Sequence, residues 1–285
     1  MNAIPTSFRN VSAFSAPRMG GPETCIVVPC YNEEARLDTE AFRAFLATGD
    51  VCFVFVNDGS KDGTLERLHS LRAAAPARVT VVDLERNGGK AEAVRQGLLT
   101  SVEMGAAQVG YWDADLATPL SAIGDFTQVM ARFAEVQVVF GARRMLLGHR
   151  IERTFARRAV SRLCAALARQ AVRLPIGDTQ CGAKLLRNTP LLRNALAQPF
   201  TAGWLFDVEL FTRLSAQMAD RRHAFYEQPL AEWTEVAGSK VSARAILRSG
   251  ITMLRLIART RLARPAVAAA PVALLPIVAP VRKAA

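Results

Sequence analysis

Val-Cys-Phe-Val-Phe-Val-Asn-Asp-Gly-Ser, at residues 51–60, joins a run of valine and phenylalanine to a polar turn. A run of this kind, closed by Asn, Asp, Gly and Ser, is typical of a β-strand that ends in a tight turn. Similar runs predict further strands at 25–29, 79–84, 109–112 and 136–140. Helical spacing of apolar residues predicts helices at 34–48, 62–74, 88–104 and 119–134. This alternation predicts an α/β fold, in which a mainly parallel sheet carries helices on both faces.

The composition of the chain excludes several classes of protein. Of its 285 residues, 51% are hydrophobic and 21% are charged, so an intrinsically disordered or collagen-like chain is excluded. The five cysteines are odd in number and never spaced as CxxC, which favours reduced core thiols and a cytosolic setting over disulfides or zinc ligands. No apolar stretch reaches about 18 residues and the N-terminus lacks the layout of a signal peptide, so we expect no conventional membrane span.

Charge is divided unevenly along the chain. The net charge is +11, with an acidic balance in residues 1–140 and a strongly basic one in residues 141–285. A cationic surface indicates an anionic partner, such as a lipid surface, a phosphorylated substrate or nucleic acid, or it serves solubility alone. Almost no aromatic residue interrupts the arginine-rich segment 141–173, so we expect no nucleic acid partner.

The basic half contains two predicted amphipathic helices, at 151–173 and 241–262. Each has arginines along one side and apolar residues along the other, a pattern that fits an anionic membrane surface or a core helix with a solvated face. We therefore expect a flexible lead-in at 1–22, a main domain at 23–240, an amphipathic helix at 241–264 and a proline- and alanine-rich tail at 265–285.

Asp113-Ala-Asp115 directly follows the predicted strand at 109–112. Side chains alternate along a strand, so the two carboxylates are expected to point the same way. Paired carboxylates form a hard oxygen site suited to Mg²⁺ or Mn²⁺ that is shared with substrate phosphates. Two surface aspartates in a turn are the alternative for this short motif.

Two further polar clusters end strands at the same predicted sheet edge, where ligands of open α/β sheets bind. Pro29-Cys-Tyr-Asn-Glu-Glu34 follows the first strand, and Asp58 follows the second. Arg86-Asn-Gly-Gly-Lys90 stands just before a helix, where paired glycines and a lysine suit a diphosphate. The spacing differs from that of a Walker loop.

In their order and spacing, these motifs resemble those of glycosyltransferase family 2, whose nucleotide-sugar domain has the Rossmann-like GT-A fold. Later stretches resemble the dolichyl-phosphate (polyprenyl-phosphate) β-glucosyltransferase branch. These stretches are Phe-Gly-Ala-Arg-Arg (140–144), Asp-Thr-Gln-Cys-Gly-Ala-Lys (178–184), Gly-Trp-Leu-Phe-Asp-Val-Glu (203–209) and Glu-Trp-Thr-Glu-Val-Ala-Gly-Ser-Lys-Val (232–241). The resemblance covers about residues 23–245.

The resemblance implies a role for each motif residue. Four residues are expected to surround uridine: Pro29, Tyr31, Glu33 and Asp58. Lys90 is expected to reach the diphosphate, Asp113 the ribose or a metal-bound water, and Asp115 the metal ion. Trp204, Asp207 and Glu209 are expected to face the sugar, with core packing as the alternative for Trp204.

The implied reaction is an inverting displacement in which a hexose, with glucose favoured, leaves UDP. A polyprenyl-phosphate acceptor needs cations rather than a base. Its second pKa is about 6, so it is already mostly a dianion at pH 7. Arg143, Arg144 and Lys240 are the candidate cations. A hydroxyl acceptor, on a saccharide or secondary metabolite, needs a general base, for which Asp178 is the candidate. Asp178 is equally well explained as a turn residue that accepts backbone hydrogen bonds.

A lipid acceptor implies a cytoplasmic protein attached peripherally to the inner face of the membrane. The arginine-striped helices would supply the attraction to anionic lipids. A third possibility is a protein that binds nucleotide sugars without catalysis. It predicts binding of UDP and no turnover with any acceptor.

Overall fold

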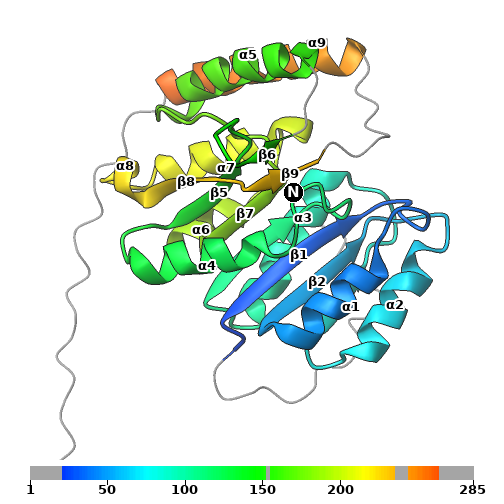
Figure 1. The fold of residues 1–285 in the computed structure, drawn as a ribbon. Helices are drawn as coiled ribbons and strands as arrows, with labels where there is room; N and C mark the ends of the chain where they lie inside the picture. The colour runs from blue at the N-terminus through cyan, green and yellow to red at the C-terminus, as the bar shows by residue number, and fades with distance from the viewer. Residues whose placement is uncertain (1–20, 152–154, 235–242, 263–285) are drawn as a thin grey trace, which may run out of the picture.

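The computed structural model describes residues 21–151, 155–234 and 243–262. Its centre is a seven-stranded sheet in the order β3-β2-β1-β4-β7-β5-β8 (Figure 1). The strands are β1 (Thr24–Cys30), β2 (Val51–Asn57), β3 (Val79–Asp83), β4 (Gln108–Trp112), β5 (Val138–Ala142), β7 (Ala183–Arg187) and β8 (Phe225–Pro229). Only β7 is antiparallel to its neighbours, β4 and β5. The predicted mainly parallel sheet is confirmed.

Helices cover both faces of this sheet, as the sequence predicts. They are α1 (Thr39–Thr48), α2 (Thr64–Ala74), α3 (Lys90–Glu103), α4 (Ala122–Arg132), α5 (Phe155–Val172), α6 (Pro190–Leu196), α7 (Phe206–Ser215), α8 (Arg221–Ala224) and α9 (Ala243–Leu262), with a 3₁₀ turn η1 (Gly203–Leu205). One apolar core lies between the sheet and α1, α2 and α4, and a second lies under α3, α6 and α7. Because β1, β2 and β4 are parallel, the loops after all three meet at one edge.

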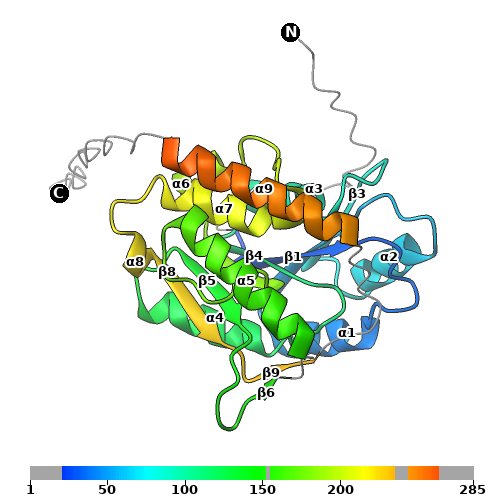
Figure 2. The same ribbon diagram turned by 90° about the horizontal axis from the view of Figure 1, so that it is seen from above.

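The two predicted amphipathic helices are α5 and α9, and they pack against each other (Figure 1, Figure 2). On α9, Met253 and Leu256 are buried, whereas Ile251 and Leu254 are exposed. Most of the arginine side chains of both stripes fall outside the described residues, so the stripes themselves stay a prediction. Among the residues that the structure describes, no helix has both the length and the apolar character needed to span a bilayer.

The predicted division into four segments stays a prediction, and α9 (Ala243–Leu262) lies within its third segment. Residues 1–20 of the lead-in and the whole tail at 265–285 lie outside the described residues. The five cysteines form no disulfide, and all except Cys164 are buried. Burial raises the pKa of the Cys25 thiol to about 12, which leaves this thiol protonated and inert.

Candidate active site

Asp113 and Asp115 lie in a turn, because β4 already ends at Trp112. Alternation along a strand therefore does not by itself orient them, and their pointing the same way stays a prediction. The Asp113 amide donates to the Gly182 carbonyl at 2.9 Å, and the Ala117 amide donates to Asp115 Oδ1 at 3.1 Å. Leu116, which follows, has a φ of 52°, a left-handed conformation that non-glycine residues adopt only where the surroundings enforce it.

Lys90 reaches this turn from the start of α3. Its Nζ atom lies 2.5 Å from Asp113 Oδ1. Burial alone lowers the pKa of Lys90, but the carboxylates of Asp113 and Asp207 outweigh that effect and raise the pKa. Lys90 thus stays charged at the position where the sequence predicts a diphosphate.

Asp58 fixes the loop that carries Lys90. Its carboxylate accepts from the amide of Gly88 at 2.7 Å and from the amide of Gly89 at 2.9 Å. Burial raises the pKa of Asp58, and the two amide donors offset only part of that increase. Asp58 is 2% exposed and shapes the lysine loop, and its contact with uridine stays a prediction.

The surroundings of the Asp115 carboxylate disfavour its negative charge, so a bound cation would stabilise it. Burial raises its pKa, as does the neighbouring Asp113, while Lys90 and Arg36 compensate only in part. Within the part of the chain that the structure describes, no group of three or more His, Cys, Asp or Glu side chains could hold a metal. Two carboxylates fit Mg²⁺ or Mn²⁺ when the remaining ligands come from substrate phosphates and water.

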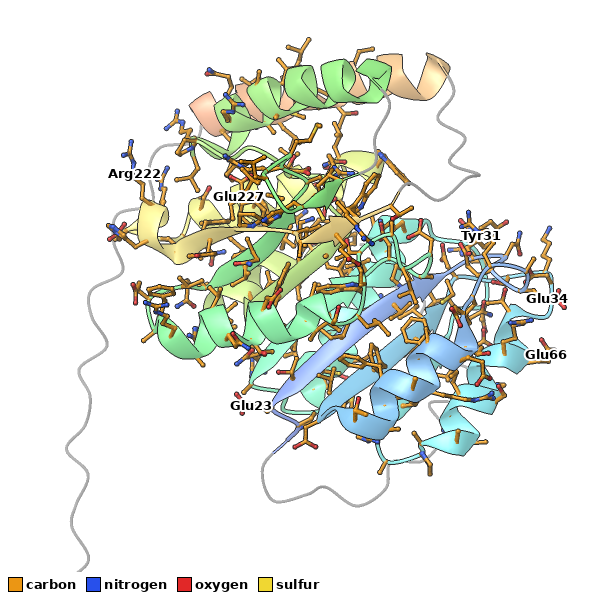
Figure 3. All side chains as sticks on the ribbon, viewed as in Figure 1. Glu23, Tyr31, Glu34, Glu66, Arg222 and Glu227 are labelled. Atoms are coloured by element: carbon orange, nitrogen blue, oxygen red, sulfur yellow. The ribbon has the colours of Figure 1, made fainter. Side chains whose placement is uncertain are left out.

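The loop after β1 presents one aromatic residue and one paired carboxylate. Tyr31 is 43% exposed at the rim of the molecule (Figure 3), where a base could stack on it. Pro29 lies two residues before Tyr31, within β1, and is partly buried. Glu33 is buried and held by Arg36 at 2.6 Å, so its carboxylate is already in use.

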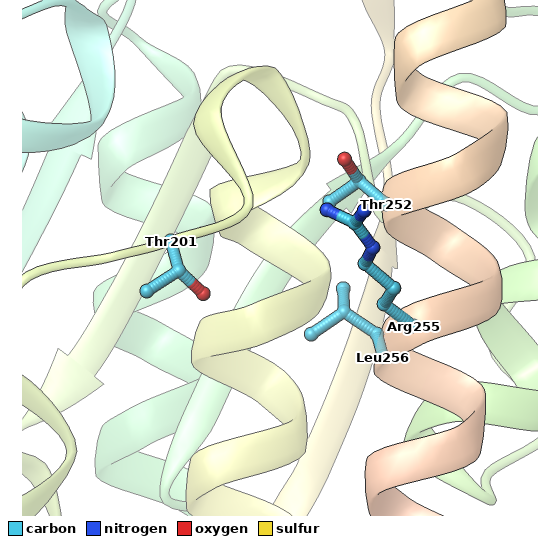
Figure 4. Close-up of a pocket in the computed structure, with 4 residues that line it drawn as sticks. All are labelled: Thr201, Thr252, Arg255 and Leu256. Carbon is cyan, nitrogen blue, oxygen red and sulfur yellow. The ribbon is translucent and has the colours of Figure 1, made fainter.

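Trp204 stands on η1 beside the same site. The indole is 59% exposed, which rules out the alternative of core packing. Lys90 Nζ lies 5.6 Å from the centre of its ring, within reach of a cation–π contact. A small pocket lies beside η1. It is lined by Thr201 and by three residues of α9: Thr252, Arg255 and Leu256 (Figure 4).

Asp207 faces the interior and belongs to a buried polar cluster. It accepts from the Tyr111 hydroxyl, and Lys184 Nζ lies 3.0 Å from its Oδ1 atom. Lys184 is fully buried and also donates to the Cys181 carbonyl at 2.5 Å. The sequence analysis assigned no role to Lys184, although a lysine within the apolar stretch Ala-Lys-Leu-Leu was a usable signal.

Glu209 likewise supports the site without facing it. Its carboxylate accepts from the amides of Thr201 and Ala202, at 2.8 and 2.7 Å, and pairs with Arg213 at 2.7 Å. Glu209 is 4% exposed. In this structure Glu209 therefore shapes the loop before Trp204, and its contact with the sugar stays a prediction.

The candidate base Asp178 is paired with one of the candidate phosphate-binding cations, Arg143. Arg143 binds Asp178 through two contacts, Nε to Oδ2 at 2.7 Å and Nη2 to Oδ1 at 2.8 Å. Arg144 pairs with Glu227 at 3.0 Å and keeps about half of its side chain exposed. Lys240 lies outside the described residues.

Comparisons with known proteins agree with this arrangement. The family model described as "Glycosyl transferase family 2" matches residues 25–192. The chain is 31% identical to a dolichyl-phosphate beta-glucosyltransferase of Mus musculus, over 76% of this chain and 68% of the relative. It is 28% identical to that of Dictyostelium discoideum, over 83% and 73%. The fold is also similar to a solved structure of glucosyl-3-phosphoglycerate synthase from Mycobacterium tuberculosis, in complex with Mn²⁺, UDP and glucosyl-3-phosphoglycerate. The TM-score is 0.56 and the identity is 22%, with 89% of this chain and 84% of that chain covered. This similarity supports the fold alone.

Proposed function

The chain belongs to glycosyl transferase family 2, and from this premise we propose that it transfers a hexose, with glucose favoured, from a UDP-sugar to a polyprenyl phosphate. The family, the resemblance to the dolichyl-phosphate glucosyltransferase branch and the GT-A type fold are confirmed. The chain is a glycosyltransferase, so the possibility of a binding protein without catalysis is set aside.

The donor half of the proposal rests on Lys90 and the two aspartates. UDP gains negative charge as the bond to the sugar breaks, and groups already positioned to meet that charge lower the barrier. Lys90 is charged, its side chain is 25% exposed, and it stands at a helix start, so it suits the diphosphate. Asp115, with Asp113, would hold Mg²⁺ or Mn²⁺, which supplies further neutralisation of the diphosphate when bound.

The observation that carries the acceptor half is the pairing of Asp178 with Arg143. A hydroxyl acceptor needs a free base, but both oxygens of Asp178 are bound by one guanidinium, so its carboxylate is already in use. A phosphate acceptor needs no base because it is mostly a dianion at neutral pH. This favours a lipid phosphate and a protein that works peripherally, at the cytoplasmic face of a membrane.

The test is UDP release from UDP-glucose with a polyprenyl phosphate or a panel of hydroxyl acceptors, with Mg²⁺, Mn²⁺ or a chelator. We expect turnover with the lipid phosphate and a divalent ion. Asp115→Ala should abolish nearly all of it, whereas Asp125→Ala, an exposed aspartate on α4, should not. Turnover with hydroxyl acceptors alone, together with a severe loss in Asp178→Asn, would contradict the acceptor assignment.

A further inference from the structure

The loop between β5 and β6 (Arg150–Ile151) presents three consecutive apolar side chains to solvent. Met145 is 63% exposed, Leu146 47% and Leu147 fully exposed. We call residues 145–147 the apolar tip. Single exposed apolar residues are ordinary, but large adjacent ones mark a contact surface.

The apolar tip is held in a defined turn. The His149 amide donates to the Leu146 carbonyl at 3.1 Å, so residues 146–149 form a β-turn. Gly148, at the third position, has a φ of 81°, the conformation that a type II turn requires there. His149 Nδ1 lies 2.7 Å from the Leu230 carbonyl, which fixes the turn to the body of the protein. Leu147 is therefore held at the apex rather than left to fold inward.

Both ends of the loop are anchored as well. Arg143, just before the tip, is bound to Asp178 and lies 5.2 Å over the Trp233 ring. After the tip, β6 pairs with β9 (Glu232–Trp233). Figure 2 shows the loop before β6 projecting from the molecule. An anchored base with an exposed apolar tip is a built surface feature.

The loop leaves the sheet at the edge that carries the active site. β5 runs in the same direction as β4, because both are antiparallel to β7. The Asp113 carboxylate contributes to the raised pKa of Arg143, so the base of the loop lies within electrostatic reach of the site. Whatever binds the tip is thus brought to the catalytic edge.

The segment that carries the tip contains cations and no carboxylate. No Asp or Glu occurs between Glu135 and Glu152, and Arg144 and Arg150 flank the tip with both side chains exposed. Arg144 shares its charge with Glu227, and Arg150 lies opposite Glu232 in the pairing of β6 with β9. Apolar side chains bordered by cations match the interface of an anionic bilayer, where hydrocarbon lies beneath negative headgroups.

We propose that residues 145–147 insert into the interface of an anionic bilayer and dock the active-site edge against it. The inference deepens the proposed function and rests on it for the nature of the acceptor. It names the segment that positions the site over a lipid-borne phosphate. The two amphipathic helices are not needed for it.

The first experiment is sedimentation of the full chain with phosphatidylcholine vesicles, with and without phosphatidylglycerol. Leu146→Ser/Leu147→Ser should lower partitioning about tenfold or more, since each leucine loses its transfer into hydrocarbon. The matched control Leu147→Met keeps the apolar surface and should bind within about twofold of the wild type. Arg150→Gln should weaken binding about fivefold, and only to vesicles with phosphatidylglycerol.

Three results would overturn the proposal. The first is unchanged vesicle binding by the serine variant. The second is a lower melting temperature of that variant, which would mean that the tip packs within the chain. The third is loss of a concentration-dependent dimer without loss of vesicle binding, which would mean that the tip binds a second copy.

A second experiment separates this inference from the proposed function. With a water-soluble short-chain isoprenyl phosphate, the serine variant should keep wild-type turnover, whereas turnover on a vesicle-borne long-chain acceptor should fall about tenfold. Equal losses on both acceptors would overturn the docking role. If the wild type released no UDP with any phosphate acceptor, the proposed function would fail, while vesicle binding would still decide whether the tip inserts.

Discussion

Removing either partner of the buried Lys184–Asp207 pair should change stability with opposite pH dependence. Burial lowers the pKa of Lys184 to about 7 and raises the pKa of Asp207 to about 8. Tyr111 donates to Asp207, Lys90 acts electrostatically on both groups, and Asp178 and Asp113 act on Lys184. Wherever the shared proton resides, the pair is neutral overall, so in the wild type it contributes little pH dependence between about pH 5 and 9.

In Lys184→Met, Asp207 remains alone and protonated when buried, so folding takes up a proton. The contribution of Asp207 to the free energy of unfolding is fully present below its ordinary pKa of 3.8. This contribution is lost as pH rises toward about 8, by about 1.4 kcal/mol per pH unit. Since pH 7 lies roughly three pH units above the ordinary pKa of aspartate, the variant should be less stable by about 4 kcal/mol at that pH. This loss falls in the range of about 3–5 kcal/mol for a broken buried ion pair.

In Asp207→Asn the sign reverses. Lys184 is buried neutral with a pKa near about 7, so folding releases a proton and stability rises with pH toward 10.5. At pH 7 the expected loss is about 5 kcal/mol, and it shrinks at higher pH. Lys184→Met/Asp207→Asn removes both ionisable groups and should recover most of the lost stability.

The assay is urea unfolding of the four proteins at several pH values, with the lysine variant measured first at low pH, where it is most stable. Opposite slopes for the single variants and a double variant less damaged than their sum are expected. Parallel slopes, or losses that simply add, would refute the view that the two groups compensate each other.

Three other substitutions test the support of the site. Asp58→Asn keeps an acceptor for only one of its two amide donors, so the loop at 86–90 should loosen and steady-state kinetics should show KM for the UDP-sugar rising about tenfold. Gly182→Ala would place a Cβ atom in the Asp113 carboxylate, so turnover should fall about a hundredfold with the fold retained by circular dichroism. Glu209→Gln should lower the free energy of unfolding by about 2 kcal/mol in urea titration, with kcat within about twofold.

The sequence predicted the first half of the fold well because its strands are short apolar runs with clear ends. The predicted strand at 51–56 and helix at 62–74 differ from β2 and α2 by at most two residues. The helix at 34–48 was predicted too long, since Asp38 caps α1 by accepting from the Ala41 amide at 2.9 Å. Strand β7 was missed because its place between β4 and β5 depends on long-range pairing.

For the site, the sequence located the motifs but could not assign the direction of each carboxylate. Asp113 and Lys90 were predicted to lie together because they occupy loops at one sheet edge, and the structure brings them together. For Glu209, sequence alone does not show whether a buried carboxylate meets a ligand or a loop amide, and the structure shows it bound to loop amides. Lys184 was overlooked since its partner, Asp207, lies on a distant helix.

The pairing of charges explains why the donor and a divalent cation should depend on each other. Lys90 cannot serve a diphosphate fully while Asp113 holds it at 2.5 Å. If Lys90 turns to the diphosphate, Asp113 is left charged beside Asp115, whose pKa is already raised by burial and by that same neighbour. A divalent cation held by Asp113 and Asp115 would offset this charge and leave Lys90 available to the diphosphate. In the proposed reaction, occupancy of the metal position would therefore be coupled to the release of Lys90 toward the leaving group.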